Sequence, residues 1–446
     1  MYKPACGQRR QGAARLLYPF LYTVCVGLTA LLLAAPASAQ LSLERALDLA
    51  QQRSQLLLAH DALARSAGDM AIAAGQPPDM TLKFGLNNVP VTGPDAFNIG
   101  NDFMTMASIG VMREFTRPEK LGARAARFER EAEVAQAGRV MEIVNLRRDT
   151  ATAWLDRHFQ ERSLALLRAQ RDEARLQIDA AEAAYRGGRG AQADIFAARS
   201  AVAAIDDRLQ QAEQQVAMST TRLVRWVGEH GRQALGATPD LATVIASPGG
   251  LEDLLKNHPH TRVLERQEAV ARADADIAKN EKQSDWSMEL MFSQRGPSYS
   301  NMVSLNFSIP LQGNQDKRRD RELSAKLALV EQLRAQRDEV IRERLAQTRS
   351  WLQQWQGNRK RLDHFDSAIV PLGAQRTQAA LASYRGGTGT LTAVLEARRV
   401  EIEVRMERLR LELETAALWT QLSHLVPAAQ TVAGNPPASV ATEKQK

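Results

Sequence analysis

A glycine-rich segment that occurs twice constrains this chain more than any other feature. Residues 185–190 read YRGGRG, residues 384–389 read YRGGTG, and an Ala-Arg pair follows each copy at the same spacing. Such recurrence indicates a tandem duplication of one supersecondary unit. Each half reads as a short helix, two alternating strands, a long charged helix, the glycine-rich turn and another long helix. We expect the first repeat at 40–238, a linker at 239–250 and the second repeat at 251–427.

The helices around these turns are predicted to be very long. No proline occurs from Glu119 to Thr238, so the roughly 65 residues before the first turn would span about 100 Å, too long for a globular core. Helices are expected at about 119–227 and 315–426. Apolar rows after each turn require neighbouring helices, as in a ring of helices, although an antiparallel coiled-coil rod has the same periodicity. The rows are Ile195, Ala198, Val202, Ile205, Leu209, Ala212 and Val216 in the first half, and Leu395, Ile402, Leu409 and Ala416 beside Val404, Leu411 and Leu418 in the second.

The N-terminus has the pattern of an export signal. Four basic residues precede an apolar run at 16–35, and the small residues at 37–39 fit a signal-peptidase site, so residues 1–39 are expected to be a cleaved signal peptide. The basic residues are Lys3, Arg9, Arg10 and Arg15.

Composition argues against nucleic-acid binding and against an enzyme. The chain has 58 basic and 51 acidic residues, and losing the four leader residues leaves little excess charge for nucleic acid. Cys6 and Cys25 both lie in the leader, so the mature chain has no thiol for a disulfide, a zinc site or a nucleophile. No nucleophile–base spacing, phosphate loop or paired acid motif occurs. We therefore expect no catalysis and no cofactor.

Four stretches, within about 79–115 and 287–311, are predicted to be strands. Three of them alternate apolar and polar residues, whereas the second, at 102–115, does not reveal its faces. Beyond the leader no run of about 18 apolar residues occurs, so a membrane crossing would have to use strands closed into a barrel. Four strands of about ten residues could cross an outer membrane but cannot close a barrel alone, so several copies would share one. A small soluble sheet packed on a core is the alternative.

On these features the sequence resembles the TolC-like outer-membrane efflux proteins, over nearly the whole mature chain. The duplicated strand and helix hairpins match that family, and each half opens with a short helix, at 43–47 and 251–255. Residues 88–97 (NVPVTGPDAF) and 102–112 are similar to the heavy-metal branch, which serves cobalt, zinc and cadmium or copper and silver exporters. The resemblance implies a mainly α fold with a β-barrel part. In it, a homotrimer with four strands per protomer closes a shared outer-membrane barrel of about 12 strands, continuous with a long periplasmic α-helical barrel.

The resemblance also implies a function and partners. The chain would be the outer-membrane channel component of a tripartite resistance-nodulation-division efflux system, a passive exit duct for heavy-metal cations. It would lie in outer-membrane lipid with a periplasmic extension, and dock on a periplasmic adaptor protein and an inner-membrane pump. A duct for organic drugs or secreted protein is an alternative in the same fold, and a periplasmic coiled-coil scaffold is an alternative of another class.

Candidate site residues lie at and just past the two turns. Glycine allows the positive φ angles that reverse a helix, and the resemblance implies that the turns are adaptor-docking tips. Family members narrow the tunnel mouth with acidic residues just past the tips, where Asp194 and Glu396 lie, although Ala393 stands at another matching position. A ring of Glu396 would attract cations, and Arg199 and Arg398 would hold the closed mouth by pairing across helices, each pair contributing about 1 kcal/mol or less. The tip glycines are Gly187, Gly188, Gly190, Gly386, Gly387 and Gly389.

No metal site is predicted. The histidines lack helical i,i+4 spacing and are expected to be ordinary surface residues: His60, His158, His230, His258, His260, His364 and His424. Met104 and Met106 could touch soft cations but are expected to face lipid or a core. Trp286 and Tyr299 flank the second hairpin, where they would suit an aromatic belt or packing against a neighbour. Residues 428–446 are expected to be a flexible tail.

Overall fold

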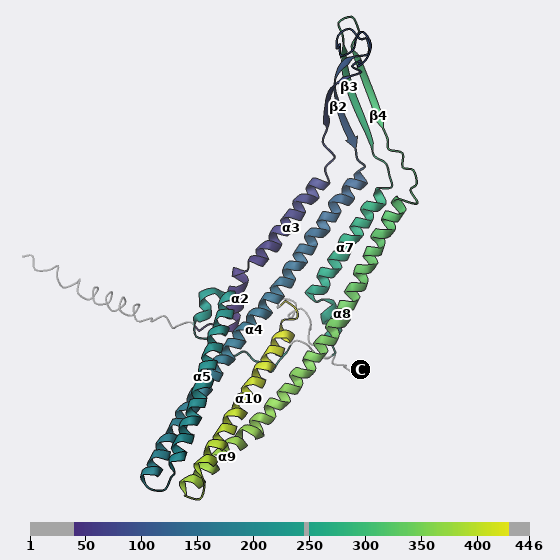
Figure 1. The fold of residues 1–446 in the computed structure, drawn as a ribbon. Coiled ribbons are helices and arrows are strands. Elements are labelled where there is room, and N and C mark those ends of the chain that lie inside the picture. Colours follow the sequence, from purple (N-terminus) through teal and green to yellow (C-terminus); the bar gives the residue numbers. More distant parts are fainter. Residues whose placement is uncertain (1–39, 245–248, 428–446) are drawn as a thin grey trace, which may run out of the picture.

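The computed structural model describes residues 40–244 and 249–427. The predicted signal peptide at 1–39, part of the predicted linker at 245–248 and the predicted tail at 428–446 lie outside the described residues. The described chain is elongated, with a sheet at one end and two helical hairpins at the other (Figure 1).

Both halves contain the predicted elements, and each also has one helix that was not predicted, between its short opening helix and its first strand. The first half contains α2 (Leu43–Arg53), α3 (Gln55–Ala74), β1 (Thr81–Asn87), β2 (Met106–Phe115), α4 (Pro118–Arg186), α5 (Gln192–Val227) and the 3-10 turn η1 (Gly228–Arg232). The second half contains α6 (Leu251–Lys256), α7 (Pro259–Asn280), β3 (Trp286–Arg295), β4 (Met302–Ser308), α8 (Arg319–His364), the π-helical turn η2 (Phe365–Ile369), α9 (Val370–Arg385) and α10 (Leu391–Ser423).

The long helices differ between the halves. Helix α4 runs without a break for 69 residues, about 100 Å, and Pro118 suits its first turn because that position needs no backbone donor. In the second half, Pro371 lies just after η2. Proline removes a backbone donor from a helix and crowds the preceding turn, and a π-helical turn can absorb that disruption. The second long helix is therefore irregular at 365–369.

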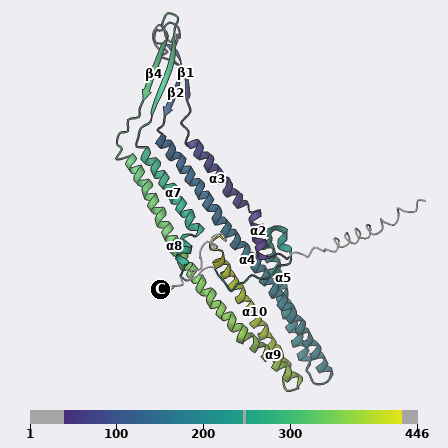
Figure 2. The ribbon, with the colours of Figure 1, turned by 180° about the vertical axis from the view of Figure 1, so that it is seen from behind.

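Four helices, α3, α4, α7 and α8, lie side by side below the sheet in both views (Figures 1 and 2). Helix α10 contacts α8 and α9 on one side and α4 and α5 on another, in agreement with two apolar rows meeting two neighbours. The largest core surrounds Trp154 and Phe159 of α4, where α2, α5 and α10 converge. Among the described residues, no helix combines the length and hydrophobicity that a membrane-spanning helix requires.

The four strands form one antiparallel sheet in the order β1-β2-β3-β4. Strands β2 and β3 have ten residues each, but β1 and β4 have seven, fewer than the ten predicted. The second strand begins at Met106 rather than 102, because residues 102–105 belong to the preceding loop. The register assigns its faces: Ile109 pairs with Phe84 and Phe292, whereas Ser108 pairs with Gly85 and Ser293. One face of the sheet is thus apolar and the other mostly polar.

Candidate functional site

The two glycine-rich turns have nearly identical backbone geometry. Gly188 and Gly387 have φ angles of 71° and 75°, a region that non-glycine residues rarely occupy. At Gly190 and Gly389 a Cβ would lie within about 3.2 Å of backbone atoms of the preceding turn, so close approach requires glycine there. In each triplet, the second glycine therefore adopts a positive φ, and the third lies too close to the preceding turn for a Cβ to fit easily.

The two turns lie together at the end of the molecule opposite the sheet (Figures 1 and 2). A small apolar cluster joins the hairpins behind them, formed by Ala181 and Ala198 of the first half with Leu391 and Val394 of the second. All four side chains are buried. The paired turns therefore form one surface, which we call the hairpin tips (185–191 and 384–390).

The carboxylate of Asp194 serves the start of α5. One of its oxygens accepts a hydrogen bond from the backbone N–H of Ala191 at 3.1 Å, and a carboxylate in the first turn also suits the helix dipole. In the second half, the hydroxyl of Thr390 accepts from the N–H of Ala393 at 3.3 Å. A structural role therefore already engages Asp194.

Glu396 has no such backbone role. It accepts two hydrogen bonds from Arg399 on the next turn of α10, at 3.0 and 2.7 Å, and this bidentate contact lowers the pKa of Glu396. The Glu396 side chain remains 48% exposed. Glu396 is thus an ionised, accessible carboxylate near the hairpin tips.

Both predicted arginines pair across helices. Arg199 of α5 contacts Glu182 of α4 at 2.8 Å, within the first hairpin. Arg398 of α10 contacts Glu173 of α4, so this pair joins the second hairpin to the first. The two arginines therefore differ in what they connect.

Sequence reasoning missed the most buried acid of this region, Glu401. It is 4% exposed, lies 3.5 Å from Arg398 and accepts from Arg405 at 2.7 Å. Further along α10, Arg408 pairs with Asp366 of η2, and this contact lowers the pKa of Asp366. The i,i+4 spacing of Glu401 and Arg405 was a signal for their pairing, but the burial of Glu401 depends on packing between helices, where Gly373 of α9 faces it.

The prediction of surface histidines is wrong for His258, and among the others only His230 and His364 are fully exposed. His258 is 5% exposed and caps α7, because its Nδ1 accepts the backbone N–H of His260 at 3.1 Å. Burial, reinforced by nearby Arg344, lowers the pKa of His258 to about 4. The following Pro259, a residue favoured at the first position of a helix, was the signal that His258 is a cap.

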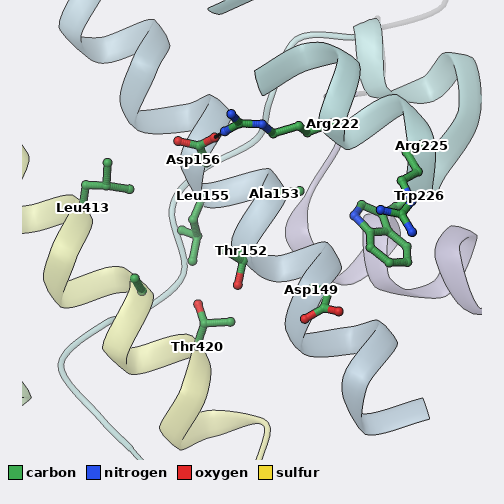
Figure 3. Close-up of a pocket in the computed structure, with 11 residues that line it drawn as sticks. Asp149, Thr152, Ala153, Leu155, Asp156, Arg222, Arg225, Trp226, Leu413 and Thr420 are labelled. Atoms are coloured by element: carbon green, nitrogen blue, oxygen red, sulfur yellow. Dashed lines mark hydrogen bonds and ion pairs between the residues drawn. The ribbon is translucent and has the colours of Figure 1, made fainter. Parts of the chain in front are cut away.

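A groove of about 500 Å³ lies between α4, α5 and α10 (Figure 3). Each charged side chain that lines it has a partner: Arg222 pairs with Asp156 at 3.0 Å, Asp149 pairs with Arg148 at 2.8 Å, and the guanidinium of Arg225 lies 4.6 Å from the ring centroid of Trp226. Within residues 40–244 and 249–427, no group of three or more His, Cys, Asp or Glu side chains could hold a metal ion.

Comparison with known proteins identifies the fold. No protein-family model matches the chain, and no curated protein matches it. CusC, studied for folding and transmembrane channel formation, matches with a TM-score of 0.71 and 14% identity, over 85% of this chain and 92% of CusC. This chain has a TolC-like channel fold. With that fold, the outer-membrane channel OprN gives a TM-score of 0.70 at 17% identity (86% and 90% covered), and VceC, an outer membrane protein from Vibrio cholerae, gives 0.66 at 16% (86% and 94%).

Proposed function

We propose that this chain is one protomer of a homotrimeric outer-membrane channel. The observation that carries the proposal is the apolar face of the sheet, on which ten large apolar side chains are 43–82% exposed. A contiguous exposed apolar surface is unusual on a protein surrounded by water, whereas an outward apolar band suits a barrel in lipid. The face includes Leu82, Phe84, Leu86, Ile109, Val111, Leu290, Phe292, Val303, Leu305 and Phe307.

The sheet edges support a shared barrel. In the described chain, β1 and β4 each have a hydrogen-bonded neighbour on one side only. Backbone groups left unpaired in lipid are costly, so β4 of one copy would pair with β1 of the next. Three copies would then supply the barrel, and their helices would form a periplasmic tunnel about 100 Å long.

Within this assembly we assign the chain to a tripartite resistance-nodulation-division efflux system, as the passive exit duct for heavy-metal cations. The hairpin tips, with their glycines at 187, 188, 190, 386, 387 and 389, would dock a periplasmic adaptor, and an inner-membrane pump would supply the energy. Glu396 would attract cations at the mouth. Arg398, through Glu173, would hold the two hairpins together in the closed mouth, while Arg199 and Asp194 would stiffen the first hairpin.

A pair of substitutions tests the membrane-facing surface. Phe84→Lys places a charge on the apolar face, where a lysine facing lipid costs up to about 2–4 kcal/mol, so we expect loss of trimers from the outer-membrane fraction. The control, Asn306→Lys, adds the same charge on the polar face, opposite Glu289, and should leave trimers intact. A purified mature chain that is monomeric and stays in solution without detergent would contradict the proposal.

The substrate is tested in a deletion strain. We expect reduced tolerance to cobalt, zinc, cadmium, copper or silver, restored by the wild-type chain. If tolerance falls only for organic drugs, the channel proposal stands and the metal assignment is wrong.

Docking is tested with introduced cysteines, because both native cysteines lie in the predicted leader. Arg189→Cys and Thr388→Cys at the hairpin tips should cross-link to the adaptor in cells. The control is Glu129→Cys, exposed on α4 far from the tips. Equal cross-linking of all three variants would rule out specific docking at the tips.

A further inference from the structure

The polar face of the sheet carries an unexpected set of apolar residues. The register assigns to this face Thr81, Lys83, Gly85, Asn87, Met106, Ser108, Gly110, Met112, Glu114, Ser287, Glu289, Met291, Ser293, Arg295, Met302, Ser304, Asn306 and Ser308. Every large apolar side chain among them is a methionine. On the opposite face, where leucine, isoleucine, valine and phenylalanine predominate, only Met288 is a methionine.

The polar face is also the more enclosed one. Ser108 and Ser293, paired on it, are 9% and 2% exposed, whereas Ile109 and Phe292, paired on the other face, are 53% and 43% exposed. Lys83 reaches across β2 to Glu289 at 2.8 Å, passing over the strand that contains Gly110. The polar face is therefore the concave side of the sheet, which would line the lumen of the proposed barrel.

Three of these methionines form a diagonal row. Met112 on β2 pairs with Glu289, the residue two before Met291 on β3. Met291 in turn pairs with Ser304, two residues after Met302 on β4. Each step moves one strand across and two residues toward the loop end of the sheet. Diagonal neighbours of this kind lie about 7–8 Å apart, within reach of long side chains.

In the row, Met112 and Met291 are partly buried and Met302 is exposed. Met291 faces Gly110, where an added Cβ would come within 3.2 Å of the Met291 Cβ, so only glycine leaves space beside it. Met302 is 43% exposed. Lys83 also lies beside the row, but the carboxylate of Glu289 neutralises its charge. Met106, by contrast, pairs with Arg295, which donates to the backbone carbonyls of Ser300 and Phe103, and we leave Met106 out of the row because this charge would repel a cation.

We propose that Met112, Met291 and Met302 are a thioether contact site for soft monovalent cations, such as silver(I) or copper(I), on the luminal face of the sheet. Thioether sulfur selects soft ions, whereas harder divalent ions prefer nitrogen and oxygen ligands. The row runs from the helix end of the sheet toward its loop end, the direction in which an exported ion would move. This inference rests on the proposed function, since the concave face is luminal only if the sheet joins a barrel.

Silver(I) binding to the purified full-length mature chain in detergent tests the site, measured by equilibrium dialysis in chloride-free buffer. The variant is Met112→Leu/Met291→Leu/Met302→Leu, which keeps side-chain volume while removing sulfur. We expect at least a tenfold loss of silver(I) affinity or the loss of one class of sites. The control Met288→Leu, which removes one sulfur from the apolar face, should bind silver(I) as the wild type does. Cobalt(II) serves as a harder probe, and none of the substitutions should change its binding.

Several results would overturn the site. Silver(I) binding that is the same in the triple variant and the wild type would do so, as would an equal loss in Met288→Leu. If the triple variant loses its fold by circular dichroism, the single variant Met291→Leu replaces it, with a smaller loss expected and an unchanged affinity as the contrary result.

The site and the channel can fail separately. Silver(I) affinity in detergent reports on the methionines, whereas trimers in the outer-membrane fraction report on the channel. Loss of silver tolerance in cells that express the triple variant, with normal trimers, is the result expected if both proposals hold. Normal silver tolerance with normal trimers would overturn the role of the row in export.

Discussion

The two halves of the chain use the same order of elements but occupy different places in the fold. Helix α4 packs against α2, α3, α5, α7 and α10, whereas α8 packs against α6, α7, α10 and η2. The buried residues of α8 are only Thr348, Leu352 and Trp355, while those of α4 extend along most of its length. A similar sequence plan thus produces a central helix in one half and an edge helix in the other. The open flank of α8 is where a neighbouring copy would pack in the proposed trimer.

The other edge of the four-helix layer is equally incomplete. Helix α3 exposes large apolar side chains, which in most proteins are covered by a neighbouring helix or strand. If α3 of one copy packs on α8 of the next, α8 is covered on both sides in the trimer. The difference in burial between α4 and α8 then exists only in the single chain. The exposed residues of α3 are Leu56, Leu58, Leu63, Met70 and Ile72.

The largest expected difference concerns two tryptophans, one in each half. Trp154 is fully buried and its indole N–H donates to the Leu41 carbonyl at 2.9 Å, so Trp154→Ala should lower the free energy of unfolding by about 3–5 kcal/mol. Trp355 is 6% exposed, and its indole nitrogen lacks a hydrogen-bond partner in the described part of the chain. Trp355→Ala should cost about 1–3 kcal/mol less, because it also removes an unsatisfied buried donor.

Guanidinium-induced unfolding in detergent measures both variants. Equal losses would mean that the edge helix is as firmly packed as the central one, and that the contrast between α4 and α8 does not extend to stability.

A second contrast concerns the N-terminal caps of α3 and α7, the helices that precede the strands in each half. Ser54 caps α3 through its hydroxyl, whereas His258 caps α7. The pKa of His258 is about 4 in the folded chain instead of 6.5, so the unfolded chain binds more protons between these values. The contribution of His258 to the free energy of unfolding should therefore be fully present above about pH 6.5. It should decrease as the pH drops toward 4, by about 3 kcal/mol in total.

The matched variant His258→Asn keeps a capping oxygen but cannot titrate. Unfolding midpoints measured from pH 7.5 to 4.5 should decline less steeply for His258→Asn than for the wild type. Parallel curves would show that other groups cause the acid sensitivity.

At the hairpin tips the halves should respond alike. Gly188→Ala and Gly387→Ala each force an L side chain to a φ above 70°, which costs about 1–2 kcal/mol.

Glycines within the helices serve as controls. Gly122 of α4 and Gly357 of α8 have open space where a Cβ would lie, so alanine there should stabilise each helix by about 0.5–1 kcal/mol. Thermal unfolding would reveal an inequality between Gly188→Ala and Gly387→Ala, and such an inequality would mean that only one tip is constrained.

How far the sequence predicts this structure depends on the range of the interactions. The absence of proline over 119–238 predicted α4 and α5, and the two glycine-rich segments predicted both turns, because these are local properties of the backbone. The faces of β2 required the pairing of Ser108 with Ser293, which joins distant parts of the chain. The burial of Glu401 and His258 likewise depends on packing between helices, of α9 on α10 at Glu401 and of α8 beside the start of α7 at His258. For this reason the acids and glycines near the tips could be named in advance, whereas the methionine row could not.

The smallest effects separate the two acidic residues near the tips. Asp194 accepts from the Ala191 N–H, so Asp194→Ala should lower the free energy of unfolding by about 0.5–1 kcal/mol, as expected for a carboxylate lost from a first turn. Glu396 forms its ion pair with Arg399, which is itself exposed, so Glu396→Gln should leave the unfolding midpoint unchanged. In planar bilayers, however, Glu396→Gln should reduce the preference for cations over anions, because the contact with Arg399 lowers the pKa of Glu396 and the wild-type carboxylate is charged at neutral pH. The reverse pattern, with Asp194→Ala changing selectivity and Glu396→Gln changing stability, would contradict the roles assigned to the two acids. It would mean that Asp194 of the first half, and not Glu396, determines the ion selectivity of the proposed tunnel mouth.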